Sequence, residues 1–107
     1  MTQILPDQLA AWLEDHAREK PALLDVREPW EFQTCRIGDS QLIPMASIPQ
    51  RLAELDPARE TVIICHHGVR SMQVGIYLER QGFDKVYNLS GGVAAWARTV
   101  DPAMPAY

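Results

Sequence analysis

The chain has 107 residues, which is enough for one domain with one core and too few for two. Apolar residues make up 47% of it and charged residues 22%, as in ordinary globular proteins. The formal net charge of −4 gives no general attraction to nucleic acid or to anionic lipid, so we expect neither as a partner. No apolar run is long enough to span a bilayer, and the first residues lack the pattern of a signal peptide, so we expect a cytoplasmic protein with no membrane contact.

Strand-like and helix-like segments alternate along the chain. In chain order, the expected elements are a helix opening at Pro6, a strand at 22–26, a short helix or turn at 29–34, a strand at 41–43, a small helix at 48–55 with Leu52 and Leu55 facing inward, a strand at 61–65, a helix at 71–81, a strand at 85–89 and a helix at 93–98. The run from Thr61 to Cys65 is the clearest strand, because it is apolar, rich in β-branched residues and too short for a buried helix.

This alternation predicts an α/β fold with a central, mostly parallel sheet and helices on both faces. We expect a single domain over residues 1–100. Residues 101–107 contain two prolines, and we expect them to form a short tail with little to pack. In open α/β sheets ligands bind beyond the carboxyl ends of the strands, and the clearest strand ends at Cys65.

The loop after this strand carries the residues with the most evident chemistry. It reads Cys65-His66-His67-Gly68-Val69-Arg70-Ser71 and leads into the expected helix. Gly68 permits the tight turn that the change from strand to helix requires. Backbone N–H groups and the helix start can then converge on Cys65, while Arg70 adds a full positive charge. This arrangement favours a thiolate at Cys65, which is a nucleophile that needs no general base.

The pattern Cys65-x-x-Gly68-x-Arg70-Ser71 resembles the active-site loop of the rhodanese (thiosulfate sulfurtransferase) family. Other segments resemble that family's motifs in the same order: Leu24-Asp25-Val26-Arg27-Glu28, Trp30-Glu31-Phe32, Leu42-Ile43-Pro44, Leu89-Ser90-Gly91-Gly92 and Ala95-Trp96. The resemblance covers about nine tenths of the chain. It implies a small single-domain member with a rhodanese-like three-layer fold.

The resemblance also implies an activity, in which a sulfane sulfur moves from an anionic donor such as thiosulfate to a thiophilic acceptor. Cys65 would carry the sulfur as a persulfide, Arg70 would bind the anion, and Ser71 would form a hydrogen bond within the loop. Arg27 would help to hold the donor near the mouth of the site. The acceptor would be cyanide, a small thiol or a protein thiol, and no cofactor is implied. The remaining loop residues would lie beside the substrate: His66, His67, Gly68 and Val69.

Two other functions use the same cysteine. Dual-specificity phosphatases of the cell cycle resemble rhodaneses in fold, but their pattern places five residues between cysteine and arginine. Here four residues separate Cys65 from Arg70, so we expect a smaller loop, sized for one sulfur atom and too tight for a phosphoryl group. A persulfide carrier or interaction module for a protein acceptor would use the same chemistry at Cys65 and differ only in the acceptor.

The other cysteine and the two histidines have simpler interpretations. Cys35 lies in a polar stretch with no helix start after it, so we expect an incidental free thiol in preference to a resolving partner for Cys65. A Cys35–Cys65 disulfide is less favoured in a reducing compartment. Three adjacent residues rarely point at one ion, so we expect no metal at Cys65, His66 and His67. Partial protonation of the histidines would instead add positive charge at the mouth of the site.

Overall fold

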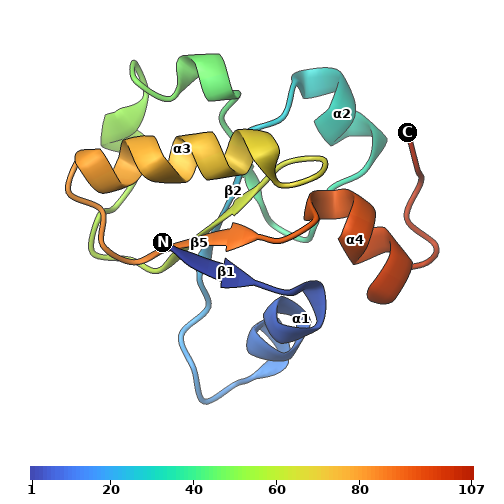
Figure 1. The fold of residues 1–107 in the computed structure, drawn as a ribbon. Helices are drawn as coiled ribbons and strands as arrows, with labels where there is room; N and C mark the ends of the chain where they lie inside the picture. The colour runs from blue at the N-terminus through green and yellow to red at the C-terminus, as the bar shows by residue number, and fades with distance from the viewer.

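The computed structural model describes residues 1–107 and has a five-stranded parallel sheet at its centre (Figure 1). The strands are β1 (Thr2–Ile4), β2 (Ala22–Asp25), β3 (Gln41–Leu42), β4 (Thr61–Ile64) and β5 (Val86–Leu89). Their order across the sheet is β1-β5-β4-β2-β3, and every neighbouring pair is parallel. The predicted α/β class and parallel sheet are confirmed. The edge strand β1 was not predicted, because it has only three residues, two of them exposed, and no alternating pattern.

Four α-helices and two 3₁₀ turns connect the strands. They are α1 (Pro6–Glu14), α2 (Pro29–Thr34), η1 (Met45–Ser47), η2 (Leu52–Glu54), α3 (Val69–Arg80) and α4 (Gly92–Thr99). The single helix expected at 48–55 is wrong. Arg51 leaves helical geometry with φ −109° and ψ 14°, so the chain makes two short turns instead. Leu52 and Leu55 nevertheless pack against the core, as expected.

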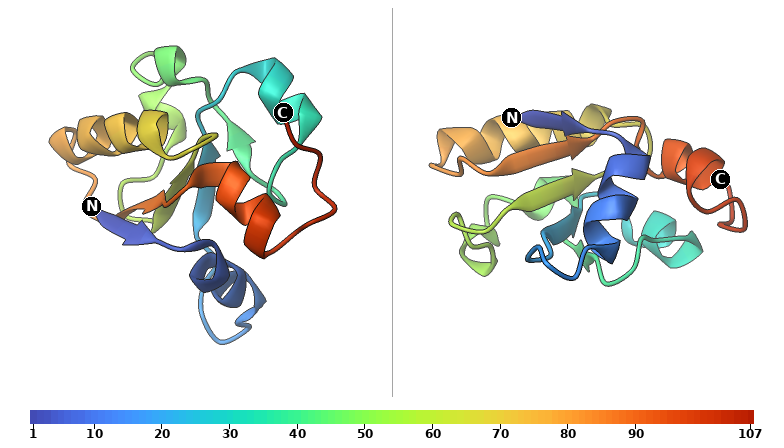
Figure 2. Two further views of the ribbon diagram at one scale, coloured as in Figure 1. Left: turned by 45° about the vertical axis from the view of Figure 1, so that its right-hand side comes forward. Right: turned by 90° about the horizontal axis from the view of Figure 1, so that it is seen from below.

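Two apolar clusters, each with ten buried residues, lie on the two faces of the sheet (Figure 2). Side chains alternate along β4: Val62 and Ile64 join one cluster, while Ile63 and the following Cys65 join the other. The first cluster packs against residues of α1 and α4, and the second against residues of α3 and the end of η1. The structure is therefore the three-layer arrangement that the sequence predicted.

The register of the sheet places the candidate loop beside the end of β2. Asp25 pairs with Ile64, and the backbone N–H of Val26 donates to the carbonyl of Ile64 at 2.9 Å. The segments that follow these two strands therefore begin side by side at the carboxyl edge of the sheet. None of the helices is both long enough and apolar enough to cross a membrane.

Residues 101–107 contradict the expectation of a tail with little to pack. Met104 packs against the core cluster that contains α1 and α4 residues, and Tyr107 reaches the segment around α2. In Figures 1 and 2 the chain runs back from the end of α4 so that its C-terminal end lies beside α2. This path brings the tail to the same edge of the sheet as the candidate loop.

Candidate active site

Cys65 lies between the end of β4 and the start of α3, with only 1% of its surface exposed. Its Sγ accepts a hydrogen bond from the backbone N–H of Gly68 at 2.9 Å. Gly68 adopts φ +100°, a left-handed conformation that favours glycine, and it caps the N-terminus of α3. A backbone donor and a helix start therefore both face the sulfur, and both stabilise negative charge there.

The N-terminus of α4 braces the same loop from behind. The backbone N–H groups of Val93 and Ala94 donate to the carbonyls of Cys65 and His66 at 2.9 and 3.1 Å. A Cβ atom on Gly92 would overlap both of these carbonyl oxygens. The glycine pair at the start of α4 thus allows the close approach of strand, loop and helix.

Ser71 connects the sulfur to a buried amide. Its Oγ lies 3.2 Å from the Sγ of Cys65 and donates to the Oδ1 of Asn88. The Asn88 amide has one orientation, because its Nδ2 donates to the carbonyl of Gly68 at 3.3 Å, and a carbonyl can only accept. A hydroxyl has a single proton, so in this arrangement Ser71 accepts from the thiol of Cys65. It must turn away from Asn88 before it can donate to a thiolate.

Arg70 reaches the site already paired with a carboxylate from α2. Its Nη1 and Nη2 donate to Oε1 and Oε2 of Glu31, both at 2.9 Å. Burial alone would raise the pKa of Glu31, but the hydrogen bonds from Arg70 and Tyr107 outweigh burial and hold it below its ordinary value. The hydrogen bond to Glu31 is also the main cause of the raised pKa of Arg70. Two of the five guanidinium donors are used by Glu31, which leaves three for an incoming anion.

Arg27 lies away from solvent, with none of its surface exposed. Its Nε and Nη2 bind the carboxylate of Asp25 at 2.7–3.0 Å, and Nη2 also donates to the carbonyl of Cys35 at 2.6 Å. Nη1 donates to the carbonyl of Glu31 at 3.3 Å and to the hydroxyl of Tyr107 at 2.9 Å. Burial alone would lower the pKa of Arg27, but these partners raise it. Because every N–H group of the guanidinium has an internal partner, this geometry favours a structural role for Arg27 over the contact with the sulfur donor that the family resemblance implied.

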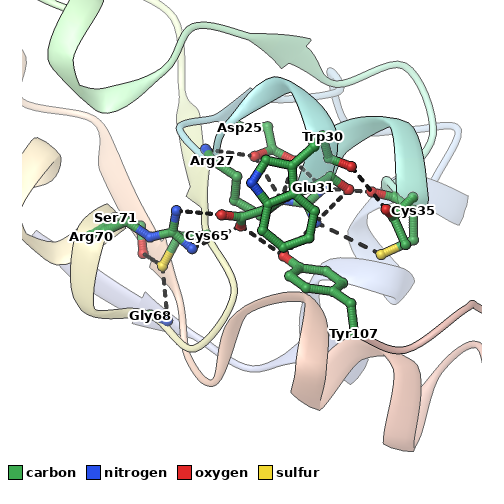
Figure 3. A network of polar contacts seen from close by, with 11 residues as sticks. Asp25, Arg27, Trp30, Glu31, Cys35, Cys65, Gly68, Arg70, Ser71 and Tyr107 are labelled. Carbon is green, nitrogen blue, oxygen red and sulfur yellow. Dashed lines mark hydrogen bonds and ion pairs between the residues drawn. The ribbon is translucent and has the colours of Figure 1, made fainter.

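Tyr107 belongs to the site although nothing in the local sequence points to it (Figure 3). Its hydroxyl donates to Oε2 of Glu31 at 2.9 Å and accepts from Arg27. Its ring stacks on His66 with centroids 4.2 Å apart and meets the edge of Trp30 at 5.3 Å. Burial raises the pKa of Tyr107 to about 12, so the hydroxyl keeps its proton at neutral pH. The contact with Glu31 joins residues 76 apart in the chain, which sequence periodicity cannot detect.

The two histidines form a stack with Tyr107. The rings of His66 and His67 lie 4.0 Å apart at an angle of 20°. Burial lowers the pKa of His66, and the nearby charges of His67 and Arg70 lower it further. His66 therefore adds less positive charge at the mouth of the site than an ordinary imidazole would. No group of three or more His, Cys, Asp or Glu side chains is placed to hold a metal ion.

Comparison with known proteins identifies the family. The Rhodanese-like domain family model matches residues 6–99. The chain is 44% identical over 80 residues to a protein named "Sulfurtransferase" from Allochromatium vinosum, covering 75% of each. It is 36% identical over 97 residues to "Thiosulfate sulfurtransferase GlpE" of Pseudomonas syringae pv. syringae, covering 91% of this chain and 88% of that one.

Solved structures agree with the sequence relatives. The crystal structure of a rhodanese-like domain protein from Staphylococcus aureus superposes with a TM-score of 0.82 at 35% identity, covering 90% of this chain and 91% of that one. Some other curated relatives are longer, and the chain spans only 31% and 26% of two of them. The family model, the curated relatives and the superposed fold agree with the loop geometry: this chain belongs to the rhodanese-like domain family.

Proposed function

We propose that this protein is a sulfurtransferase that moves a sulfane sulfur from an anionic donor such as thiosulfate to a thiophilic acceptor through a persulfide on Cys65. One observation carries the proposal. The Sγ of Cys65 lies at a helix start, accepts the Gly68 N–H at 2.9 Å and contacts the Ser71 hydroxyl at 3.2 Å. Curated relatives of similar length are named sulfurtransferases, which supports the same activity class.

The first half-reaction loads the cysteine. The Cys65 thiolate attacks the outer sulfur of thiosulfate, a new S–S bond forms, and the S–S bond of thiosulfate breaks. Sulfite leaves with the electron pair, so the summed charge of −3 is the same on both sides of this step. The free N–H groups of Arg70 can donate hydrogen bonds to the oxygens of the approaching anion. No proton transfer is needed once the thiol has ionised.

The second half-reaction transfers the sulfur from Cys65 to an acceptor. An acceptor such as cyanide attacks the outer sulfur of the persulfide, the S–S bond to Cys65 breaks, and thiocyanate leaves. The thiolate returns with the electron pair of the broken bond, and Ser71 can turn to donate to it. A small thiolate or a protein thiolate would accept the sulfur in the same way and become a persulfide itself. The chemical nature of the acceptor therefore distinguishes two functions. An enzyme would transfer the sulfur to small molecules, and a carrier would transfer it to one protein.

Geometry gives less support to phosphoryl transfer. A phosphoryl group presents three equatorial oxygens and needs several converging donors. The loop has four residues between Cys65 and Arg70, one fewer than in the phosphatase pattern, so it has fewer backbone N–H groups to surround a phosphoryl group. Glu31, the carboxylate that contacts Arg70, has a lowered pKa and is held in this pair, so it is a poor acid for a leaving alcohol.

Steady-state turnover tests the proposed function. We expect wild-type protein to form thiocyanate from thiosulfate and cyanide, with one sulfite released for each thiocyanate formed. Replacing cyanide in turn by a small thiol and by a thiol-containing protein fraction identifies the preferred acceptor class. Hydrolysis of an aryl phosphate with no thiocyanate formed would contradict the proposal and favour the phosphatase.

A further inference from the structure

Residues 101–107, here called the strap, hold their place almost without backbone hydrogen bonds. The strap leaves α4 with the N–H of Asp101 donating to the carbonyl of Trp96 at 3.1 Å, and the N–H of Met104 donates to the carbonyl of Asp101 at 3.0 Å. No backbone hydrogen bond involves residues 105–107, and proline at 102 and 105 removes two donors. The far end of the strap is therefore held by side chains alone.

A cavity lies beneath the strap, so the strap spans a hollow instead of packing along its length. The cavity has a volume of about 370 Å³. Its lining includes Val93 and Ala97 from α4, Met104 and Tyr107 from the strap, His66 from the candidate loop, and Cys35, while Cys65 lies outside the lining. Only Met104 of the strap packs against the main core. A segment fixed at two points over a cavity can lift with the loss of few contacts.

Tyr107 provides the second of these two fixed points, and its contacts reach both ends of the candidate loop. Its ring stacks on His66, the residue directly after Cys65. Its hydroxyl donates to the same Glu31 oxygen that accepts from Nη2 of Arg70. The ring also meets Trp30 of α2 (Figure 3), and together with the stack on His66 this contact joins the strap, the loop and α2.

We propose that Tyr107 is a positioning residue that fastens the strap to the mouth of the site and thereby keeps Cys65 covered until the strap lifts. The proposal rests on the proposed function only in taking Cys65 as the reacting group. Cys65 is 1% exposed, and an attacking donor must touch its Sγ, so the site has to open before any reaction. The strap is the part that lifts most readily, because Tyr107 alone fixes its far end.

The hydrogen bond from Tyr107 to Glu31 is present near neutral pH. The Tyr107 hydroxyl remains a donor below its pKa of about 12. Glu31 remains an ionised acceptor, because its pKa lies below the ordinary carboxyl value. Tyr107 is nevertheless 36% exposed, so its ring can leave the stack without crossing the core. The closed arrangement is thus formed near neutral pH and can open reversibly.

Alkylation of Cys65 by iodoacetamide tests this gate without any sulfur donor. Iodoacetamide is small and neutral, and peptide-resolved mass spectrometry separates its reaction at Cys65 from that at Cys35. We expect Tyr107→Ala to raise the rate at Cys65 on the order of fivefold, since it removes the stack and both hydrogen bonds. Tyr107→Phe keeps the ring and should restore part of the protection. Tyr87→Phe is the matched control, because it deletes a hydroxyl that donates to Glu60 at 2.9 Å outside the site.

Three results would overturn the proposal, provided that circular dichroism shows each variant to be folded. The first is an unchanged or slower rate at Cys65 in Tyr107→Ala. The second is equal alkylation rates for Tyr107→Ala and Tyr107→Phe, which would show that the ring does not protect Cys65. The third is a similar acceleration in Tyr87→Phe, which would indicate general loosening. None of these results depends on sulfur transfer, so failure of the gate and failure of the proposed function are distinguishable.

Discussion

Cys65 and Cys35 are both buried free thiols, with exposed fractions of 1% and 8%, but they lie at opposite ends of helices. Cys65 precedes α3 and receives the Gly68 N–H at its sulfur. Cys35 is the C-cap of α2, the end of the helix that carries the partial negative charge of the helix dipole. Cys65 therefore lies where a helix end stabilises negative charge, and Cys35 lies where a helix end disfavours it.

The charged neighbour of Cys35 does not reverse this difference. Nη1 of Arg27 lies 3.7 Å from the Sγ of Cys35, but the same guanidinium is paired with Asp25. Its positive charge is thus already balanced within the core. The comparison teaches that burial alone does not identify a functional cysteine. The direction of the helix beside it and the availability of free donors separate the two thiols.

The largest expected effect comes from exchanging each thiol in turn. Cys65→Ser should lower thiocyanate formation by at least about a hundredfold, because the nucleophile is lost. Cys35→Ser is the matched control and should stay within about threefold of wild type, since its sulfur takes no part in the reaction. Steady-state rates with thiosulfate and cyanide measure both. Equal losses in the two variants would remove the distinction between the thiols.

The brace behind the Cys65 loop can be tested with two glycines. Gly92→Ala should lower the free energy of unfolding by about 3 kcal/mol, because its Cβ meets the Cys65 carbonyl and its φ is +59°. Gly38→Ala has φ +47° and open space around its Cβ, so only the backbone cost of about 1 kcal/mol applies. Urea unfolding measures both values. A Gly92→Ala cost no larger than that of Gly38→Ala would show that the close approach of α4 is unimportant.

The Arg70 guanidinium should increase the rate with anionic donors and have little effect on the rate with neutral reagents. Arg70→Ala should lower kcat/KM for thiosulfate by about tenfold or more, since it removes the free donors and leaves the Glu31 carboxylate unpaired. Its effect on alkylation of Cys65 by neutral iodoacetamide should be much smaller. Arg51→Ala breaks a comparable pair with Glu54 elsewhere and should change neither rate. If Arg70→Ala lowers both rates equally, Arg70 is structural.

The smallest expected effect is the pH dependence that Glu31 adds to stability. Its folded-state pKa is lower than the unfolded value of 4.5, so its contribution is complete above that value and is lost as the pH falls through the folded-state pKa. Glu31→Gln should therefore cost about 1–2 kcal/mol near pH 7, with the difference shrinking below about pH 4.5.

Urea unfolding of wild type and Glu31→Gln across this pH range measures the effect. Glu14→Gln, which removes an exposed carboxylate from α1, provides the control and should show no such trend. A Glu31→Gln cost that stays constant from neutral to acid pH would contradict the pairing with Arg70.

Sequence reasoning succeeded where the relevant residues are adjacent in the chain. The strand ending at Cys65, the turn at Gly68 and the helix after it form one continuous segment, so local rules locate the candidate nucleophile. The prediction of a helix at 48–55 failed because Arg51 leaves helical geometry, at φ −109° and ψ 14°, so that two short turns replace one helix.

The rest of the site could not be read from local pattern because it depends on distant contacts. Glu31 meets Arg70 across 39 residues and Tyr107 across 76. The burial of Arg27 had a usable signal. Asp25 and Arg27 are two positions apart at the end of a strand, so they share a face, and opposite charges there pair with each other before they bind a ligand.

The most direct test of the difference between the two thiols is a mass measurement after incubation with thiosulfate. We predict that the protein gains about 32 Da, one sulfur atom, and that peptide mapping places it on Cys65. Addition of cyanide should remove this mass and yield thiocyanate, and Cys65→Ser should never gain it. A wild-type mass that does not change with thiosulfate, or a sulfur found on Cys35 instead, would contradict the central claim.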